Sequence, residues 1–269
     1  MKDDQLINKK FHILQRKKIL HDSERFIYNE VGSRITDNLE GINLSINKCL
    51  EIGLASNNIC KYLFKRNKNI NYDALDLSQD LLTSLPNLRK NIKKYCADHD
   101  KWNIAKDEYN LILSNFYIHL TNNLEKLLKN IYISLKDNGF FIASIPGSNF
   151  FTELKEVMLY TDLKLYGGVY KRFIDSFSIQ IINKLMKNNN FKDTLIEIDL
   201  IKLQYDNFEK LINDVKNMGN SYIFNDRKKK LENKKYFQIA EEIYWEKFSI
   251  NKKIRLTLEI VYFSGWKSV

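Results

Sequence analysis

Two acids and a glycine at the ends of predicted strands are the residues whose types and spacing best indicate chemistry. One apolar run ends in Glu51 and Gly53, and a second run ends in Asp76 about one β–α–β unit later. In open α/β sheets the first loop binds part of a nucleotide, and the second acid binds a ribose. Ala55 and Asn57 stand where a pyrophosphate-binding loop needs glycine for close backbone approach. The pattern therefore predicts a bound nucleoside without a pyrophosphate.

The elements that would position these residues alternate between strands and helices. Residues 122–135 repeat apolar side chains at helical spacing, and Gly139 is expected to stop this helix. We expect strands at 48–52, 70–77, 95–98, 108–115, 140–145, 195–201 and 255–263, and further helices at 11–39 and 179–186. This alternation predicts an α/β fold with a mostly parallel sheet. The 269 residues, 44% of them apolar, are enough for one such domain.

With these elements the chain resembles class I S-adenosylmethionine-dependent methyltransferases. The resemblance implies a Rossmann-like sheet of seven mostly parallel strands with helices on both faces, and S-adenosylmethionine as the cofactor. In that family the first loop wraps the methionine part of the cofactor, the second acid binds the ribose, and an acid after the third strand meets the adenine. Ala55 and Asn57 depart from the glycines that are common in that loop. The implied cofactor-binding residues are Glu51, Gly53, Leu54, Ala55, Asp76, Leu77, Asp98 and Ser114.

Nearly the whole chain is similar to two branches of that family. One branch methylates malonyl-acyl carrier protein in biotin synthesis, and the other is a complex I assembly factor that hydroxylates an arginine of a quinone-module subunit. The segment from Val31 to Ile35 and the closing Gly265-Trp266-Lys267 favour the second branch. The resemblance therefore implies an enzyme that acts on a protein substrate in assembly of respiratory complex I (NADH dehydrogenase). The alternatives are a malonyl-acyl-carrier-protein O-methyltransferase and a non-catalytic assembly chaperone.

The predicted organisation has two parts. Residues 1–40 form a helical N-terminal cap, and residues 41–269 form the S-adenosylmethionine-binding methyltransferase domain. Within that domain, residues 207–248 are expected to be a helical insertion before the last strand. As a lid over the substrate side, this insertion would exclude water from the reaction. The inner face of the cap is expected to carry Phe26, Ile27, Val31 and Ile35.

Candidate catalytic and substrate-binding residues follow the fourth and fifth strands. A carboxylate acceptor needs positioning and a dry pocket more than a base, so an obvious base is not required. Tyr117 and His119 are the catalytic candidates, although His119 could equally cap the next helix. Phe116, Tyr170 and Arg172 are the candidates for substrate binding, and Arg172 could clamp an anion. No histidine has metal-ligand spacing, so no metal site is expected.

The residues expected at the mouth of the site bear on the choice of substrate. A malonyl thioester would need a cation such as Arg172 near its carboxylate, whereas an arginine side chain would need acidic or aromatic partners. The balance of aromatic and acidic over cationic residues favours the arginine-bearing protein segment. The residues expected at the mouth are Phe116, Tyr117, Phe150, Phe151, Glu153 and Tyr170.

The net charge of +10 raises the question of an anionic partner. Basic residues are spread along a chain rich in lysine, asparagine and isoleucine, so a nucleic acid partner is not favoured. The densest basic cluster, Arg227 to Lys230, is either a solvated helix face or a contact for an acidic protein such as an acyl carrier protein.

The remaining composition indicates an intracellular setting. No apolar run is long enough to cross a bilayer, and Met1 to Lys18 lack the apolar segment of a signal peptide. We therefore expect a cytoplasmic protein. Cys49, Cys60 and Cys96 are odd in number without CxxC spacing, which indicates reduced thiols.

Overall fold

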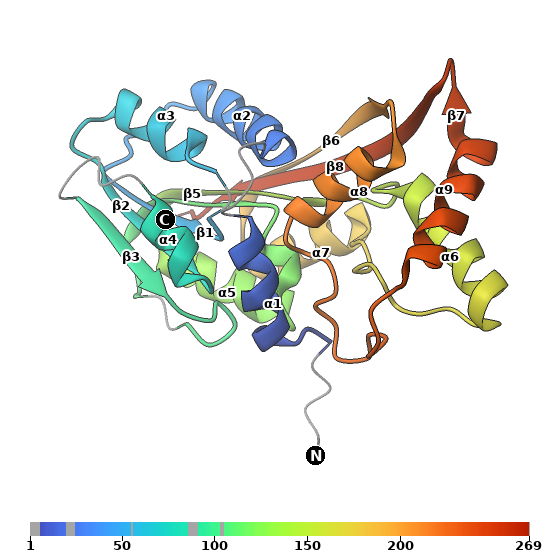
Figure 1. Cartoon of the computed structure of the whole chain (residues 1–269). Helices are drawn as coiled ribbons and strands as arrows, with labels where there is room; N and C mark the ends of the chain where they lie inside the picture. The colour runs from blue at the N-terminus through green and yellow to red at the C-terminus, as the bar shows by residue number, and fades with distance from the viewer. Residues whose placement is uncertain (1–5, 20–24, 55, 86–90, 103–104, 269) are drawn as a thin grey trace.

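The computed structural model describes residues 6–19, 25–54, 56–85, 91–102 and 105–268. The expected α/β architecture is confirmed there, because one mixed sheet carries helices on both faces (Figure 1). Its strands lie in the order β3-β2-β1-β4-β5-β8-β6, with the short β7 paired to β8. The strands are β1 (Lys48–Ile52), β2 (Asn71–Asp76), β3 (Ile92–Cys96), β4 (Tyr109–Asn115), β5 (Leu135–Pro146), β6 (Lys192–Tyr205), β7 (Ser249–Ile250) and β8 (Lys253–Trp266).

The register of the parallel strands places their carboxyl ends side by side. The pairs among β3, β2, β1, β4 and β5 are parallel, and β8 is antiparallel to both β5 and β6. Glu51 of β1 is in register with Ala74 of β2 and Leu113 of β4. In β1, Cys49 and Leu50 are both fully buried although they point to opposite faces, because helices cover the sheet on both sides. Residues that follow β1, β2 and β4 therefore meet at one edge.

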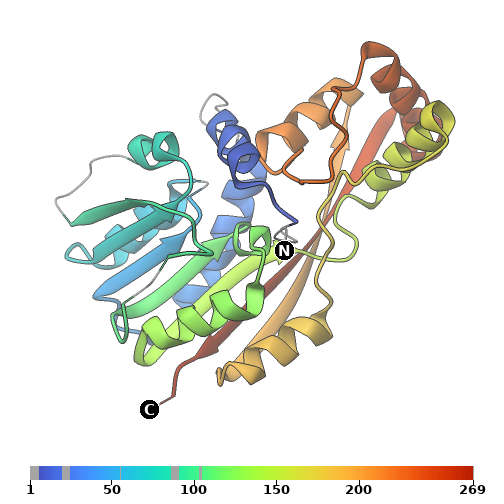
Figure 2. The same cartoon turned by 90° about the horizontal axis from the view of Figure 1, so that it is seen from below.

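The helices form a layer on each face of the sheet (Figure 2). Helices α2 and α3 pack together over one face, whereas α5 and α7 cover the other. The helices are α1 (Lys9–Lys18), α2 (Phe26–Glu40), α3 (Asn58–Arg66), α4 (Gln79–Ser84), α5 (Leu124–Ser134), α6 (Thr152–Tyr166), α7 (Ile179–Asn188), α8 (Phe208–Asn217) and α9 (Lys234–Phe248), with the 3-10 turn η1 (Ile118–Leu120) before α5.

Asparagine and serine fix where many of these helices begin. Their side-chain oxygens accept hydrogen bonds from backbone N–H groups of the first turn, which the helix itself leaves without partners. The residues that cap α1, α4, α5, α7, α8 and α9 in this way are Asn8, Ser78, Asn123, Ser178, Asn207 and Asn233.

Strands β6 and β8 form a long antiparallel pair that extends beyond β5 (Figure 2). Helices α6 and α9 pack against each other beside this pair of strands, and the Tyr236 hydroxyl donates to the Met158 carbonyl at 3.3 Å. The expected helical character of residues 207–248 is confirmed by α8 and α9. Both long strands exceed the predicted bounds, and the extra strand β7 brings the number in the described sheet to eight.

Two local predictions are wrong. Helix α5 ends at Ser134, and β5 begins at once because the fully buried Leu135 pairs with Tyr109 of β4. Asn138 takes the left-handed conformation, with φ of 58°, so Gly139 does not end the helix. In the N-terminal cap the other predicted inner residues are buried, but Phe26 is 50% exposed at the first position of α2. None of the helices in the described ranges is long and apolar enough to span a bilayer.

Candidate functional site

The loop after β1 and the acid at the end of β2 come together as expected. Gly53 has a φ of 83°, a conformation that favours glycine, and its N–H donates to the Leu75 carbonyl at 2.7 Å. The Leu54 N–H then donates to Oδ2 of Asp76 at 2.8 Å, and the Ser78 N–H donates to Oδ1 at 2.8 Å. These bonds hold the Asp76 carboxylate at the edge of the sheet where parallel α/β folds bind ligands.

Helix α1 places a guanidinium on the same carboxylate. Nε and Nη2 of Arg16 donate to the two oxygens of Asp76 at 3.1 and 2.5 Å, and Nη2 also donates to the Leu54 carbonyl at 2.6 Å. Both side chains are completely buried. Burial by itself would lower the pKa of Arg16, but the Asp76 carboxylate raises it above the ordinary value. Asp76 therefore already has a full set of partners.

The ring of Tyr117 covers the glycine of the loop. A Cβ built on Gly53 would lie 1.9 Å from Cγ of Tyr117. The Arg16 guanidinium lies 4.6 Å from the centre of the same ring, and His12 stacks on it at 5.7 Å. Arg16 and Tyr117 together occupy the space beside Gly53 and Asp76.

Replacing Gly53 with alanine should destabilise the fold by about 1–3 kcal/mol, the usual cost of forcing an extra methyl into a packed site. The new Cβ has no room, because Tyr117 is itself fully buried. Gly168→Ala is the matched control, since a Cβ there would meet nothing within 4 Å. Urea unfolding of both variants measures the difference, and equal stabilities would contradict the close approach.

Several buried polar atoms around α1 have no hydrogen-bond partner in the described part of the chain. Buried polar atoms are normally paired, so a group of unpaired ones is typical of a site for a polar ligand. The donors and acceptors here suit a nucleoside joined to an amino acid, although Arg16 and Tyr117 occupy the space. The unpaired atoms are both ring nitrogens of His12, Nη1 of Arg16, Oε1 of Glu51, the Tyr117 hydroxyl and Nδ1 of His119.

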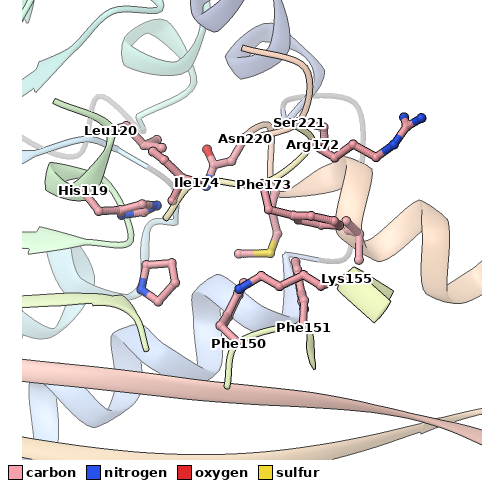
Figure 3. Close-up of a pocket in the computed structure, with 13 residues that line it drawn as sticks. His119, Leu120, Phe150, Phe151, Lys155, Arg172, Phe173, Ile174, Asn220 and Ser221 are labelled. Carbon is pink, nitrogen blue, oxygen red and sulfur yellow. The ribbon is translucent and has the colours of Figure 1, made fainter. Parts of the chain in front are cut away.

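A cavity of about 60 Å³ lies next to this region, on the side of the 3-10 turn η1 (Figure 3). His119 lines it, and burial, followed by the charge of Arg16, lowers the pKa of this histidine to about 3, so the ring is neutral. Lys155 of α6 lines the same cavity between aromatic residues. Among the residues that the structure describes, no carboxylate lines the cavity, whose lining comprises His119, Leu120, Pro146, Phe150, Phe151, Lys155, Arg172, Phe173, Ile174, Val215, Met218, Asn220 and Ser221.

Comparison with known families agrees with this arrangement of loop, acid and sheet. A family described as a methyltransferase domain matches residues 22–196, well over half of the chain. The chain belongs to this methyltransferase family. The predicted class I methyltransferase fold and its cofactor, S-adenosylmethionine, are thereby confirmed.

Individual relatives of this methyltransferase are named for two different activities. The arginine-hydroxylase NDUFAF5 of Danio rerio is 26% identical over 254 residues, covering 92% of this chain and 78% of its own length. A malonyl-[acyl-carrier protein] O-methyltransferase of Methylovorus sp. is 23% identical over 256 residues, covering 92% of this chain and 84% of its own. Phosphoethanolamine N-methyltransferase 2 of Haemonchus contortus shares the fold at a TM-score of 0.53 and 16% identity, over 88% of this chain and 52% of that one.

The other predicted cofactor-binding residues of the methyltransferase lie in or near the region that Arg16 and Tyr117 fill. Ser114 is fully buried and donates to the Ile52 carbonyl at 2.7 Å. The second carboxylate oxygen of Glu51 accepts from the Tyr72 hydroxyl, and burial followed by the charge of Asp76 raises the pKa of Glu51 well above its ordinary value. Leu54 and Leu77 are buried beside Asp76, whereas Ala55 lies outside the described residues.

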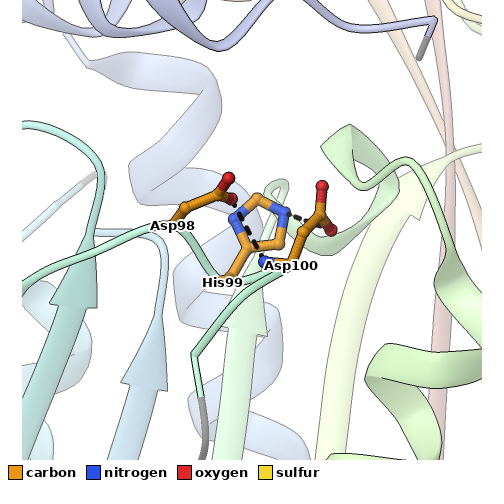
Figure 4. Close-up of side chains that lie close together, drawn as sticks. All are labelled: Asp98, His99 and Asp100. Atoms are coloured by element: carbon orange, nitrogen blue, oxygen red, sulfur yellow. Dashed lines mark hydrogen bonds and ion pairs between the residues drawn. The ribbon is translucent and has the colours of Figure 1, made fainter. Parts of the chain in front are cut away.

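Asp98 belongs to a separate group of charged residues at the end of β3. Asp98, His99 and Asp100 each have a side-chain atom that could bind a metal ion, and these three atoms lie within 4.8 Å of one another (Figure 4). The Lys9 ammonium lies 3.1 Å from Oδ1 of Asp98 and 2.7 Å from Oδ2 of Asp100. Burial, together with the charge of Lys9, lowers the pKa of His99 to about 4. The positive charge that lies between the two carboxylates is therefore the ammonium of Lys9.

The residues predicted to bind substrate do not lie together in one site. Phe116 and Tyr117 are fully buried and do not line the cavity, whereas Tyr170 lines an adjoining groove. Arg172 reaches the cavity, but its guanidinium pairs with both oxygens of Asp162 and with Glu232 at 2.5 Å. Figure 3 shows this guanidinium pointing away from the cavity. Arg172 is thus neutralised within the chain.

The expected acidic character of the mouth is wrong for Glu153. Its carboxylate accepts from the N–H and the hydroxyl of Thr257 at 2.9 and 2.6 Å and is buried against β8. Lys155, two residues later on α6, lines the cavity instead, because positions two apart do not share a helix face. Sequence analysis missed Lys155, and only the helical period of α6 could have separated it from Glu153.

Proposed function

We propose that this chain is an S-adenosylmethionine-dependent methyltransferase that acts on a carboxylate carried by another protein. The observation that carries the proposal is the joining of the Gly53-Leu54 loop to Asp76 beside a cavity whose described lining has the Lys155 ammonium and no carboxylate. The relative that methylates malonyl-acyl carrier protein supports this substrate class.

Binding of the cofactor would rearrange α1. When bound, S-adenosylmethionine supplies a methyl group on a sulfonium. Asp76 would accept from the ribose hydroxyls, and the Gly53-Leu54 backbone would lie along the methionine part. Because Arg16 fills both oxygens of Asp76, this requires Arg16 to release them. The aromatic residues around His119 would exclude water from the acceptor.

A second candidate function rests on the arginine-hydroxylase relatives. Their similarity covers 90–92% of this chain. It supports the sequence-based preference for a protein arginine in complex I assembly as a second hypothesis. Glu153 does not supply the acidic partner that an arginine substrate would need, because its carboxylate is paired with Thr257. A non-catalytic assembly chaperone is the third candidate, and it differs from both enzymes in needing no cofactor turnover.

The proposed partner surface at Arg227 to Lys230 is only partly free. The Arg227 guanidinium lies 3.4 Å from the centre of the Phe11 ring, and the Lys228 ammonium pairs with Glu232 at 2.8 Å. Lys229 and Lys230 are exposed. Contact with an acidic partner would therefore fall mainly on these two lysines.

Titration calorimetry with S-adenosylhomocysteine tests the cofactor site. We expect the wild type to bind and Asp76→Asn to bind roughly 10- to 100-fold more weakly, because hydrogen bonds to a charged group contribute about 1.5–3 kcal/mol. Asp80→Asn is the control, since the Asp80 side chain is 46% exposed and forms a surface ion pair with Lys17. Absence of binding by the folded wild type would favour the chaperone, and an unchanged affinity of Asp76→Asn would contradict the assigned site.

Mass spectrometry separates the two enzymatic candidates. The purified chain would be incubated with S-adenosylmethionine and either malonyl-loaded acyl carrier protein or the quinone-module subunit. A gain of one methyl mass on the malonyl group is the expected result. A gain of one oxygen mass on an arginine of the subunit would overturn the carboxylate proposal.

A further inference from the structure

Lys155 is the uncompensated cation of the cavity. No hydrogen bond or ion pair to its ammonium is found among the described residues, and it is partly exposed between the inner cavity and an outer hollow. Burial lowers its pKa, and the charges of Asp175 and Glu259 act in the opposite direction without an ion pair to the ammonium among the described residues. One of these, Glu259, already accepts from the Asn149 side chain at 2.6 Å.

Arg172 and Lys228, two other basic residues near Lys155, have acidic partners. Asp162 and Glu232 neutralise Arg172, and Glu232 also pairs with Lys228. Asp175 in turn pairs with Lys171 at 2.7 Å, and among the described residues no carboxylate forms an ion pair with the Lys155 ammonium. The charge balance of the inner cavity is therefore set by Lys155.

The surroundings of Lys155 strengthen any ion pair formed there. Phe150, Phe151 and Phe173 form apolar walls, which reduce screening by water. An ammonium held in such a place without a counter-ion is unfavourable, so an incoming anion gains both attraction and hydrogen bonds. The neutral ring of His119 adds no competing charge.

The cavity also has an entrance suited to an extended substrate. It shares Arg172, Phe173, Val215 and Ser221 with a groove of about 340 Å³. The groove is largely apolar in its interior. Its lining includes the basic residues Lys18, Lys171, Lys216 and Lys228. A long flexible arm could therefore lie in the groove and bring its terminal group to Lys155.

We infer that Lys155 binds the terminal carboxylate of the substrate in the inner cavity and thereby selects an anionic acceptor over a neutral or cationic one. This rests on the proposed function, because it assigns a specificity-determining residue to the same site. It also explains why no base is needed nearby, since a carboxylate acceptor is already unprotonated.

The experiment compares malonyl-loaded with acetyl-loaded acyl carrier protein, which differ in the terminal carboxylate. Binding is measured for the wild type, Lys155→Met, Lys155→Arg and the control Lys164→Met, an exposed lysine of the same helix. We expect Lys155→Met to lose about 10- to 100-fold in affinity for the malonyl form and to change little for the acetyl form. Lys155→Arg should restore the preference, and Lys164→Met should retain it.

Calorimetry with S-adenosylhomocysteine on the same four proteins separates this inference from the proposed function. Lys155 lies outside the loop and acid that would hold the cofactor, so cofactor affinity should be equal in all four. If cofactor binds normally but Lys155→Met keeps the malonyl preference, or the wild type has none, the role of Lys155 is refuted while the cofactor site stands. If the folded wild type binds no cofactor, the proposed function fails first.

Discussion

Replacing Arg16 with methionine should destabilise the protein by about 3–5 kcal/mol and increase the stabilisation that S-adenosylhomocysteine provides. The first effect follows because the substitution leaves the completely buried Asp76 carboxylate without its counter-ion. The second follows because the ribose hydroxyls no longer compete with a guanidinium for the two carboxylate oxygens. Thermal unfolding with and without S-adenosylhomocysteine measures both effects.

Arg34→Met provides the control for this experiment. Arg34 lies on the surface of α2 with its side chain 50% exposed, and its ion pairs with Glu30 and Asp199 are long. Such pairs contribute about 0–1 kcal/mol, so the variant should resemble the wild type. Weaker ligand binding by Arg16→Met than by Arg34→Met would show that Arg16 binds the cofactor rather than competing with it. Equal stability of the two variants would rule out the buried pair.

The sequence predicted the part of the site that depends on neighbouring residues along the chain. Strand β1 and its loop could be recognised because a central strand is largely apolar on both faces and a glycine follows it. The structure shows that this glycine, Gly53, has a positive φ. Asp76 could be placed because the β–α–β connection fixes its distance along the sequence from Gly53. These are local patterns, and the structure brings the two residues into contact through Leu54.

The sequence could not predict contacts between distant elements. Arg16 and Asp76 are 60 residues apart, and no periodicity in either segment indicates their pairing. Glu153 and Lys155 were indistinguishable as charged neighbours until α6 placed them on different faces, one against Thr257 and one in the cavity. Charge composition therefore gave the opposite expectation for the mouth, because only the fold decides which charges are already paired.

Three buried histidines lie around α1, near the Arg16–Asp76 pair. His12, His99 and His119 are each at most 3% exposed. Burial is the largest cause of the lowered pKa in all three, and positive charges from Arg16 and Lys9 act in the same direction. The pKa falls to about 4 for His99 and to about 3 for His119. These histidines are therefore neutral in the folded protein.

We expect the protein to lose stability steeply as the pH falls from about 6.5 towards 4. The unfolded chain protonates its histidines near pH 6.5, whereas the folded chain does not, so the unfolded state binds more protons in this window. Each histidine that stays neutral should then lower the free energy of unfolding by up to about 1.4 kcal/mol per pH unit. Urea unfolding at pH 7.5, 6.5, 5.5 and 5.0 measures the slope. His119→Gln removes one of these groups and should reduce the slope by about one proton, and a stability that is constant from pH 7.5 to 5.0 would contradict neutral burial of all three.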